Sequence, residues 1–200
     1  MNYLQLANTS ALYAPLLQIP DEIVPFMEFL DKQNAKSFLE IGVCMGGTYF
    51  LWSHIVKGGG IKLGIELKNG PWGAPTEINE KMYGDLKRRI ETMAPNSFLL
   101  YGNSSDKSSI DWVDNKLGKE SLDFIFIDGD HSYEGVKRDY YNYLPFVKEG
   151  GFIAMHDIKD TQRHREAGCT VGNFWKELKG DKIEFVDNTY DWGGIGVVKL

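Results

Sequence analysis

The chain has 200 residues, 42% of them hydrophobic and 25% charged, which suits one compact domain and is too short for two ordinary ones. Its formal net charge is −6 and it has no long basic run, so nucleic acid is not expected as a partner. No segment approaches the ~20 apolar residues that span a bilayer, and no basic leader precedes Lys32. We therefore expect a cytoplasmic protein with no membrane partner.

The first part of the chain, 1–36, is expected to be an N-terminal helical extension to a domain at 37–200. It contains a predicted helix from Asp21 to Asp31, with Asp21 as the cap. The apolar face of this helix consists of Ile23, Phe26, Met27 and Leu30. Such a face can cover a ligand site, pack on a second subunit in a homodimer, or simply close the core.

Short apolar runs alternate with helical stretches over the rest of the chain. Seven runs are predicted as strands: Ser37–Ile41, Ile61–Leu67, Ser97–Tyr101, Leu122–Ile127, Gly151–Met155, Ile183–Val186 and Ile195–Leu200. Between them, Glu77–Met93 carries apolar residues at helical spacing. This alternation predicts an α/β fold with a mostly parallel sheet and helices on both faces. The connection Asp187–Gly194 is too short for a crossover helix, so the last strand should be antiparallel to its neighbour.

A glycine turn joins the first strand to the next helix. Gly42 can form the tight turn, while Gly46 and Gly47 let the backbone approach a ligand at the helix N-terminus. The spacing does not match G-x-G-x-x-G, which argues against pyrophosphate binding. Glu66 ends the second strand, where a carboxylate can accept hydrogen bonds from ribose hydroxyls. The turn and the acid therefore predict one ligand site at the strand ends.

The pattern Glu40-x-Gly42-x-x-x-Gly46 resembles the first motif of class I S-adenosylmethionine (SAM) dependent methyltransferases. This resemblance implies a Rossmann-like three-layer sandwich with a seven-stranded sheet and SAM as the cofactor. It also implies that Glu66 holds the SAM ribose and that the segment after the third strand contacts adenine and the methionine part. The cofactor-binding residues expected from it are Glu40, Gly42, Gly46, Glu66, Asn103, Ser104, Ser105 and Asp128.

A second motif, Ile127–Gly135, resembles small-molecule O-methyltransferases related to macrolide-sugar methyltransferases and cephalosporin-hydroxylase-like proteins. Asp128 and Asp157 each follow an apolar run, so two carboxylates at adjacent strand ends can share a divalent cation such as Mg²⁺. The region also resembles catechol and caffeoyl-type O-methyltransferases, in which acids at these two positions hold magnesium. Their third ligand, an asparagine, is Ile158 here, and His156 or water is the candidate to complete the shell.

His131 and Asp128 are the predicted catalytic residues. His131 lies where the resembled families carry a catalytic lysine, and its unperturbed pKa near neutrality suits a general base. The alternative is a histidine that only caps or packs the helix beginning near Ser132. Asp123 and Asp139 are expected to be ordinary surface charges.

Two loops are expected to define an acceptor pocket. The loop Asn69–Asn79 is rich in glycine and proline and offers Trp72 as a wall. The segment Asp160–Thr170 brings Arg163, His164 and Arg165, which can pair with an acidic group on the acceptor or stay solvated. Phe174, Trp175 and Leu178, at helical spacing, are expected in the core.

These features predict a SAM-dependent methyltransferase that modifies a hydroxyl oxygen of a small molecule. A SAM-binding module without catalysis is an alternative, although it would have no need of both Asp128 and His131. A nicotinamide-dependent oxidoreductase is a second alternative, which the glycine spacing and the lack of a Tyr-x-x-x-Lys pair near the fourth or fifth strand disfavour. The sequence leaves the acceptor open among sugars, polyketides, catechol-like compounds and peptides.

Overall fold

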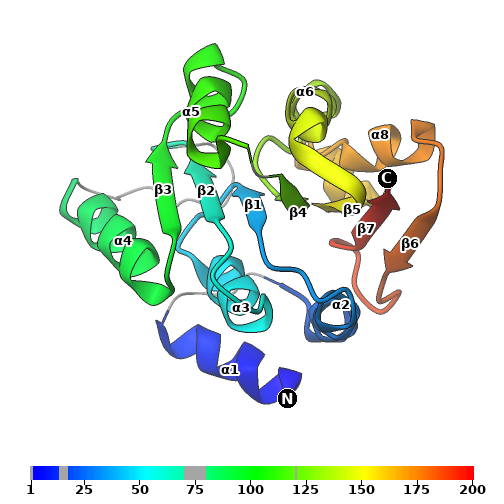
Figure 1. The fold of residues 1–200 in the computed structure, drawn as a ribbon. Coiled ribbons are helices and arrows are strands. Elements are labelled where there is room, and N and C mark those ends of the chain that lie inside the picture. Colours follow the sequence, from blue (N-terminus) through cyan, green and yellow to red (C-terminus); the bar gives the residue numbers. More distant parts are fainter. Residues whose placement is uncertain (1, 14–17, 70–79, 120) are drawn as a thin grey trace.

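The computed structural model describes residues 2–13, 18–69, 80–119 and 121–200, and its elements are shown in Figure 1. The strands are β1 (Phe38–Ile41), β2 (Lys62–Glu66), β3 (Ser97–Tyr101), β4 (Leu122–Ile127), β5 (Val147–His156), β6 (Lys182–Phe185) and β7 (Ile195–Lys199). The α-helices are α1 (Tyr3–Tyr13), α2 (Pro20–Lys32), α3 (Gly47–Ile55), α4 (Glu80–Met93), α5 (Lys107–Leu117), α6 (Tyr133–Tyr143), α7 (Gln162–Glu166) and α8 (Val171–Glu177). A 3₁₀ helix, Leu144–Phe146, precedes β5.

The strands form one sheet in the order β3-β2-β1-β4-β5-β7-β6. Strands β1 to β5 pair in parallel, whereas β7 is antiparallel to both β5 and β6. The short connection between β6 and β7 explains this reversal, because only a hairpin-like link can join the two strands. The predicted Rossmann-like α/β fold with an antiparallel last strand is therefore confirmed.

Helices cover both faces of the sheet (Figure 1). Helices α2, α3 and α4 lie on one face and α5, α6 and α8 on the other, while α1 lies outside α3. The apolar residues of the strands alternate between the two faces, so Phe124 and Phe126 belong to one core cluster and Ile125 and Ile127 to the other. Strand β4 is buried on both faces, as the continuous apolar run predicted.

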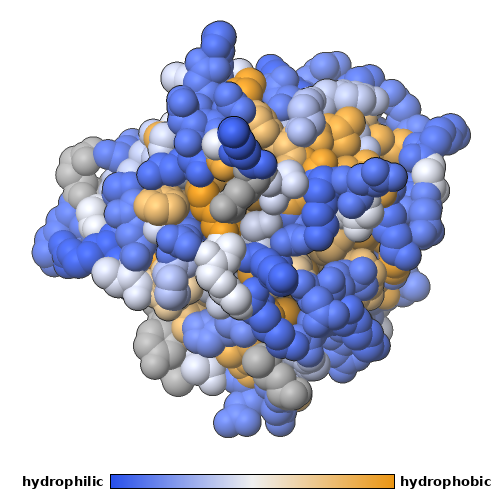
Figure 2. All heavy atoms as spheres, in the orientation of Figure 1, coloured by the Kyte–Doolittle hydropathy of each residue, from blue (hydrophilic) through white to orange (hydrophobic). Residues whose placement is uncertain are grey.

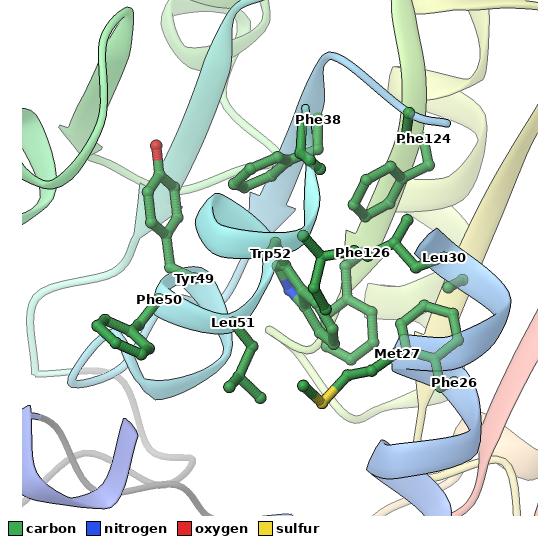
Figure 3. Packing of buried hydrophobic residues seen from close by; sticks show 14 of the residues in the cluster. Phe26, Met27, Leu30, Phe38, Tyr49, Phe50, Leu51, Trp52, Phe124 and Phe126 are labelled. Atoms are coloured by element: carbon green, nitrogen blue, oxygen red, sulfur yellow. The ribbon is translucent and has the colours of Figure 1, made fainter. Parts of the chain in front are cut away.

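Helix α2 closes the first of these cores. Figure 3 shows Phe26, Met27 and Leu30 pointing from α2 toward Trp52 and Phe126. The ring of Phe26 lies edge-on to Trp52, with 5.2 Å between the ring centroids. The apolar face predicted for this helix is thus core. Its predicted cap is wrong, because α2 begins at Pro20 with Ile19 as N-cap and no side chain caps it. Proline at the first position supplies a helical φ without needing the missing hydrogen bond.

Other helical predictions hold with changed bounds. Leu86 and Ile90 of α4 are buried as expected, and 77–79 lie outside the described residues. Phe174, Trp175 and Leu178 are buried in the second core. The segment that contains Trp72 lies outside the described residues, so its predicted place in the acceptor pocket stays a prediction.

Asp123, at the start of β4, is not a simple surface charge. Its Oδ2 accepts hydrogen bonds of 2.8 Å from the backbone N–H groups of both Lys36 and Ser37. Its Oδ1 pairs with Lys148. Asp123 therefore fixes the entry of the chain into β1, and the expectation of an ordinary surface residue was wrong.

The outer surface matches this arrangement. In Figure 2, hydrophilic residues cover most of the visible face, and hydrophobic ones show between them near its middle. Within the described part of the chain, no helix has the length and apolar character needed to cross a bilayer.

Candidate active site

A first cavity of about 220 Å³ lies at the carboxyl ends of β1, β2 and β4. Open α/β sheets bind ligands at this edge. Predicted cofactor residues that line the cavity are Gly42, Glu66, Asn103, Ser104 and Asp128. The structure thus brings most of the predicted set around one space, which we call the donor cavity.

Gly42 makes the turn that opens the donor cavity. Its φ of +87° is unfavourable for residues with a side chain, and an added Cβ would lie 2.0 Å from the carbonyl oxygen of Asp128. The turn is fixed by hydrogen bonds from Gly42 N–H to the Ile65 carbonyl at 2.9 Å and from Asp128 N–H to the Ile41 carbonyl at 2.8 Å. Only glycine lets the chain pass so close to the end of β4.

Gly46 serves a different contact. It precedes α3 with a φ of +87°, and an added Cβ would lie 3.3 Å from both Leu86 and Ile90 of α4. Gly46 does not line the donor cavity. The packing of α3 on α4 accounts for this glycine, and a contact between Gly46 and the cofactor stays a prediction.

Glu66 faces the donor cavity from the end of β2. Its side chain is buried, and Oε2 accepts a hydrogen bond from the Cys44 backbone N–H at 2.7 Å. Burial raises its pKa from 4.5 to about 7, an effect that hydrogen bonds from the 43–44 backbone partly oppose. The cavity therefore holds a carboxyl group whose ionised form gains from added hydrogen-bond donors such as ribose hydroxyls.

Glu40 lies beneath the turn and does not line the donor cavity. Its Oε1 accepts a hydrogen bond from the Thr48 hydroxyl, and Oε2 has no partner among the described residues. Burial raises its pKa well above the usual value. Ser105 is also absent from the lining, and its N–H and hydroxyl donate hydrogen bonds to Asn103 Oδ1 at 2.9 and 2.8 Å. For these two residues cofactor contact stays a prediction.

Asp139 is a cavity residue that the sequence analysis missed. It lies on α6, is 1% exposed and lines the donor cavity, so the expectation of a surface charge was wrong. Burial raises its pKa from 3.8 to about 6. The signal was present in the helix phase, because Val136, Tyr140 and Tyr143 are buried and place Asp139 on the same face.

A second cavity of about 420 Å³ adjoins the first, and we call it the acceptor cavity. Its chemically active lining residues are Asp128, His131, His156, Asp157, His164 and Cys169. Gly42, Cys44 and Asp128 line both cavities. The two spaces therefore meet at the ends of β1 and β4.

Histidines and carboxylates cluster at this junction. His131 Nδ1 lies 2.9 Å from Asp157 Oδ2, and His131 Nε2 lies 3.4 Å from Asp128 Oδ1. His156 Nδ1 is 3.3 Å from Oδ1 of each of these two aspartates. Gln18, just before α2, donates a hydrogen bond of 3.2 Å to Asp128 Oδ2. The predicted catalytic and metal-binding residues thus share one site.

The backbone holds Asp157 in a rare conformation, with a φ of +60°. Such conformations in residues other than glycine are costly and concentrate at functional sites. Asp157 Oδ1 is buried without a hydrogen-bond partner in the part of the chain that the structure describes. Its neighbours there are the imidazole nitrogens of His156 and His164, each at 3.3 Å.

His164 supports Asp157 from α7. Its Nδ1 lies 2.7 Å from the Lys159 carbonyl, to which it donates, and its Nε2 accepts a hydrogen bond of 3.1 Å from the Gly193 N–H. The same Nε2 lies 3.3 Å from Asp157 Oδ1, and this carboxylate raises the pKa of His164 above its usual value against the effect of burial. The sequence placed His164 in the acceptor region but gave no sign of its hydrogen bond with Gly193, because the two residues are 29 positions apart.

The loop that carries Gly193 is anchored by helix α2. Glu22 is 1% exposed, and its two carboxylate oxygens accept hydrogen bonds from the N–H groups of Asp187 at 2.9 Å and Gly194 at 2.7 Å. The same loop places Trp192 in the lining of the acceptor cavity. A buried carboxylate on the N-terminal helix therefore holds one wall of the cavity.

The two arginines of the 160–170 segment lie in different places. Arg163 lines the acceptor cavity and pairs with Asp191 at 3.2 Å. Arg165 does not line the cavity and pairs with Asp160 at 2.5 Å. Acceptor contact by Arg163 is compatible with this geometry.

Comparison with known proteins identifies the family. A family model described as a methyltransferase domain matches residues 39–158, more than half of the chain. The chain belongs to this methyltransferase family.

Solved structures agree with the fold of this methyltransferase. It is similar to an O-methyltransferase from Bacillus cereus in complex with SAH, with a TM-score of 0.62 and 17% identity over 100% of this chain and 91% of that one. It is also similar to the methyltransferase MycE of the mycinamycin biosynthetic pathway, in complex with Mg and SAH, with a TM-score of 0.57 and 16% identity over 100% of this chain and 55% of that one. Among curated proteins, the uncharacterized protein y4gI of Sinorhizobium fredii is 25% identical over 158 residues, which are 77% of this chain but 16% of the relative. The methyltransferase thus spans a small part of that relative's length.

Two carboxylates raise the pKa values of the histidines at the junction in this methyltransferase. Burial opposes a charge on His131, but hydrogen bonds with Asp157 and Cys169 and the charges of Asp128 and Asp157 raise its pKa to about 10. The same two carboxylates raise the pKa of His156 well above 6.5 against the effect of burial. The prediction that the pKa of His131 lies near neutrality is therefore wrong for the residues described. A further positive charge nearby would lower this pKa.

The donor set fits a divalent cation. Asp128, His156 and Asp157 each offer one ligand atom, and these atoms lie within 4.8 Å of one another. Carboxylate oxygens and imidazole nitrogens bind such ions at about 2.0–2.2 Å, so the ligand atoms around one ion lie roughly 3 Å apart. The 3.3 Å separations of His156 Nδ1 from both carboxylates match this spacing. Ile158 is buried in the second core and offers no ligand atom, and a ligand role for His156 in its place stays a prediction.

Proposed function

We propose that the protein transfers a methyl group from SAM, bound in the donor cavity, to a hydroxyl oxygen of a small molecule in the acceptor cavity. The observation that carries this proposal is the junction of the two cavities at Gly42, Cys44 and Asp128. Methyl transfer from a sulfonium is an in-line displacement, so donor and acceptor must meet at one point with their reacting atoms aligned. The neighbours' SAH, the demethylated product of SAM, supports the choice of donor.

Different residues of the donor cavity contact different parts of the cofactor. Glu66 accepts hydrogen bonds from the ribose hydroxyls, since its carboxylate gains from hydrogen-bond donors, and the turn at Gly42 lines the place of the methionine arm. Asn103 and Ser104 lie where adenine is expected. The aspartate at the junction, Asp128, then faces the sulfonium, whose positive charge a carboxylate stabilises.

Residues of the acceptor cavity remove the proton of the attacking hydroxyl. His131 lies between Asp128 and Asp157 and accepts the proton of the attacking hydroxyl as the oxygen bonds to the methyl carbon and the C–S bond breaks. Asp128, His156 and Asp157 would hold a divalent cation, which acidifies a bound hydroxyl. The Mg of MycE supports a cation in this kind of site. The positive charge of such a cation would lower the pKa of His131 from about 10 toward the range of a useful base.

The acidic balance of the chain favours a small acceptor over nucleic acid. A homodimer stays a prediction that sedimentation tests directly.

Two measurements test the proposed function. Calorimetry should show that SAM and SAH bind the protein while NAD does not, and tight NAD binding without SAM binding would falsify the assignment. Labelled SAM incubated with a panel of hydroxylated metabolites should then yield a methylated product. Binding of SAM with no transfer to any acceptor would favour the module without catalysis.

A further inference from the structure

We infer that the cation site formed by Asp128, His156 and Asp157 selects a transition-metal ion, such as Mn²⁺, Fe²⁺, Co²⁺ or Zn²⁺, over Mg²⁺. The inference deepens the proposed function and rests on it for the place of the ion beside the acceptor hydroxyl. It starts from the kind of atom that each residue presents.

One of the three ligands is a nitrogen. His156 is 4% exposed, and its Nδ1 faces both carboxylates at 3.3 Å. Mg²⁺ is a hard cation that prefers oxygen ligands and loses water reluctantly, whereas imidazole suits the first-row transition metals. An imidazole among three protein ligands therefore shifts the preference of the site away from Mg²⁺.

The ligand atoms contact one another and neighbouring histidine nitrogens, and no lysine or arginine holds them within the described residues. Asp157 Oδ1 is buried without a hydrogen-bond partner, and so is the second ring nitrogen of His156, within the described residues. Among the described residues that line the cavity, Arg163 is the only lysine or arginine, and its side chain pairs with Asp191 and is 62% exposed. Within the described chain, the groups that face both Asp128 and Asp157 are therefore the imidazoles of His131 and His156, not an ammonium or a guanidinium.

The surroundings extend the same preference. His131, Asp157 and Cys169 form a second group whose ligand atoms lie within 4.8 Å of one another. A thiol and a second imidazole are soft or borderline ligands that Mg²⁺ does not use. Because this group shares Asp157 with the first, and His131 is needed as the base, we assign the ion to the group that contains His156.

The test uses the full chain stripped of metal by chelation and titrated separately with Mg²⁺, Mn²⁺, Co²⁺ and Zn²⁺ in a calorimeter. We expect the transition metals to bind at least about 10-fold more tightly than Mg²⁺, since even residues that only orient a ligand change metal affinity by that factor. Pulsed EPR of bound Mn²⁺ should show coupling to an imidazole ¹⁴N. Both readouts are independent of turnover and need no variant.

Variants then identify the ligand. His156→Glu replaces the nitrogen with oxygen, so the ¹⁴N coupling should disappear and the preference for transition metals over Mg²⁺ should shrink by roughly 10-fold or more. His54→Gln, which changes a histidine on α3 outside the cluster, should alter neither result. Cys169→Ser separates the two groups, because it weakens binding only if the ion sits at His131, Asp157 and Cys169.

Equal affinity of the native chain for Mg²⁺ and Mn²⁺, or no binding of any of the four ions, overturns the inference. Coupling that survives in His156→Glu, or loss of binding in Cys169→Ser, overturns the assignment of the ligand. SAH binding measured on the same samples keeps the two proposals apart: absent SAH binding contradicts the proposed function, whereas methyl transfer in excess chelator contradicts the metal alone.

Discussion

Replacing Glu66 with Gln should make the protein more stable at alkaline pH and at the same time weaken its hold on the cofactor. Burial raises the pKa of Glu66 from 4.5 to about 7 in the folded chain. A raised carboxyl pKa means that the protonated form stabilises the fold below pH 4.5 and that this contribution is lost as the pH rises through about 7. The difference between the two pKa values corresponds to about 3 kcal/mol of lost stability at pH 8, because each tenfold change in proton affinity is worth about 1.36 kcal/mol.

Glutamine has no proton to lose and its carbonyl oxygen can still accept from the Cys44 N–H. In urea unfolding without cofactor, the free energy of unfolding of Glu66→Gln minus that of the native chain should therefore increase by about 2.5 kcal/mol from pH 5 to pH 8. SAH affinity should fall by about 1.5–3 kcal/mol, or roughly 10- to 160-fold, because hydrogen bonds to a charged group are lost.

Glu28→Gln is the matched control, since Glu28 lies exposed on α2. It should leave the pH dependence of unfolding and the affinity for SAH as they are. A stability difference between native chain and Glu66→Gln that does not change with pH refutes the buried titration. Unchanged SAH affinity in Glu66→Gln places the ribose elsewhere.

The remaining predictions concern the turn, the base and the anchored loop. Gly42→Ala should destabilise the fold by more than about 3 kcal/mol in urea unfolding, because its Cβ would overlap the Asp128 carbonyl, and a near-native midpoint would contradict that overlap. His131→Ala should lower kcat by about 10²–10⁴-fold with SAH affinity intact, and native kcat on the true acceptor would move the base to another residue. Glu22→Gln should cost about 1–3 kcal/mol of stability and raise KM for the acceptor, because an amide NH₂ cannot accept from a backbone N–H. Glu28→Gln on the same helix should do neither, and equal effects of the two variants would show that Glu22 does not anchor the loop.

The sheet could be predicted from the sequence because its strands are buried on both faces. The bounds predicted from continuous apolar runs agree with β3 and β4 to the residue, and the short link before β7 predicted its antiparallel direction. Strand β5 begins four residues before the predicted Gly151, because Lys148 and Glu149 are exposed and carry no apolar signal. Helix α1 was not predicted, since it is defined by packing against α2 and α3 rather than by a clear apolar stripe.

The site could be predicted where it depends on topology and not where it depends on long-range contacts. Parallel strands end at one edge, so Asp128 and Asp157 had to be neighbours. The contact between His164 and Gly193 joins helix α7 to the loop before β7, which meet only in the folded chain. The pKa of His131 could not be anticipated either, because it depends on two carboxylates whose distances the sequence does not encode.

The anchoring of the cavity wall by Glu22 has a consequence for how the protein is made. The hydrogen bond from Gly194 to Glu22 joins residues 172 positions apart, so α2 and the wall it holds cannot meet until Gly194 has left the ribosome. Contacts of such separation form late, after the local helices and neighbouring strands. Helix α2 can pack by its apolar face, but its buried carboxylate has its hydrogen-bond partners in the loop between β6 and β7. Until these bonds form, this wall of the acceptor cavity lacks its anchor on α2.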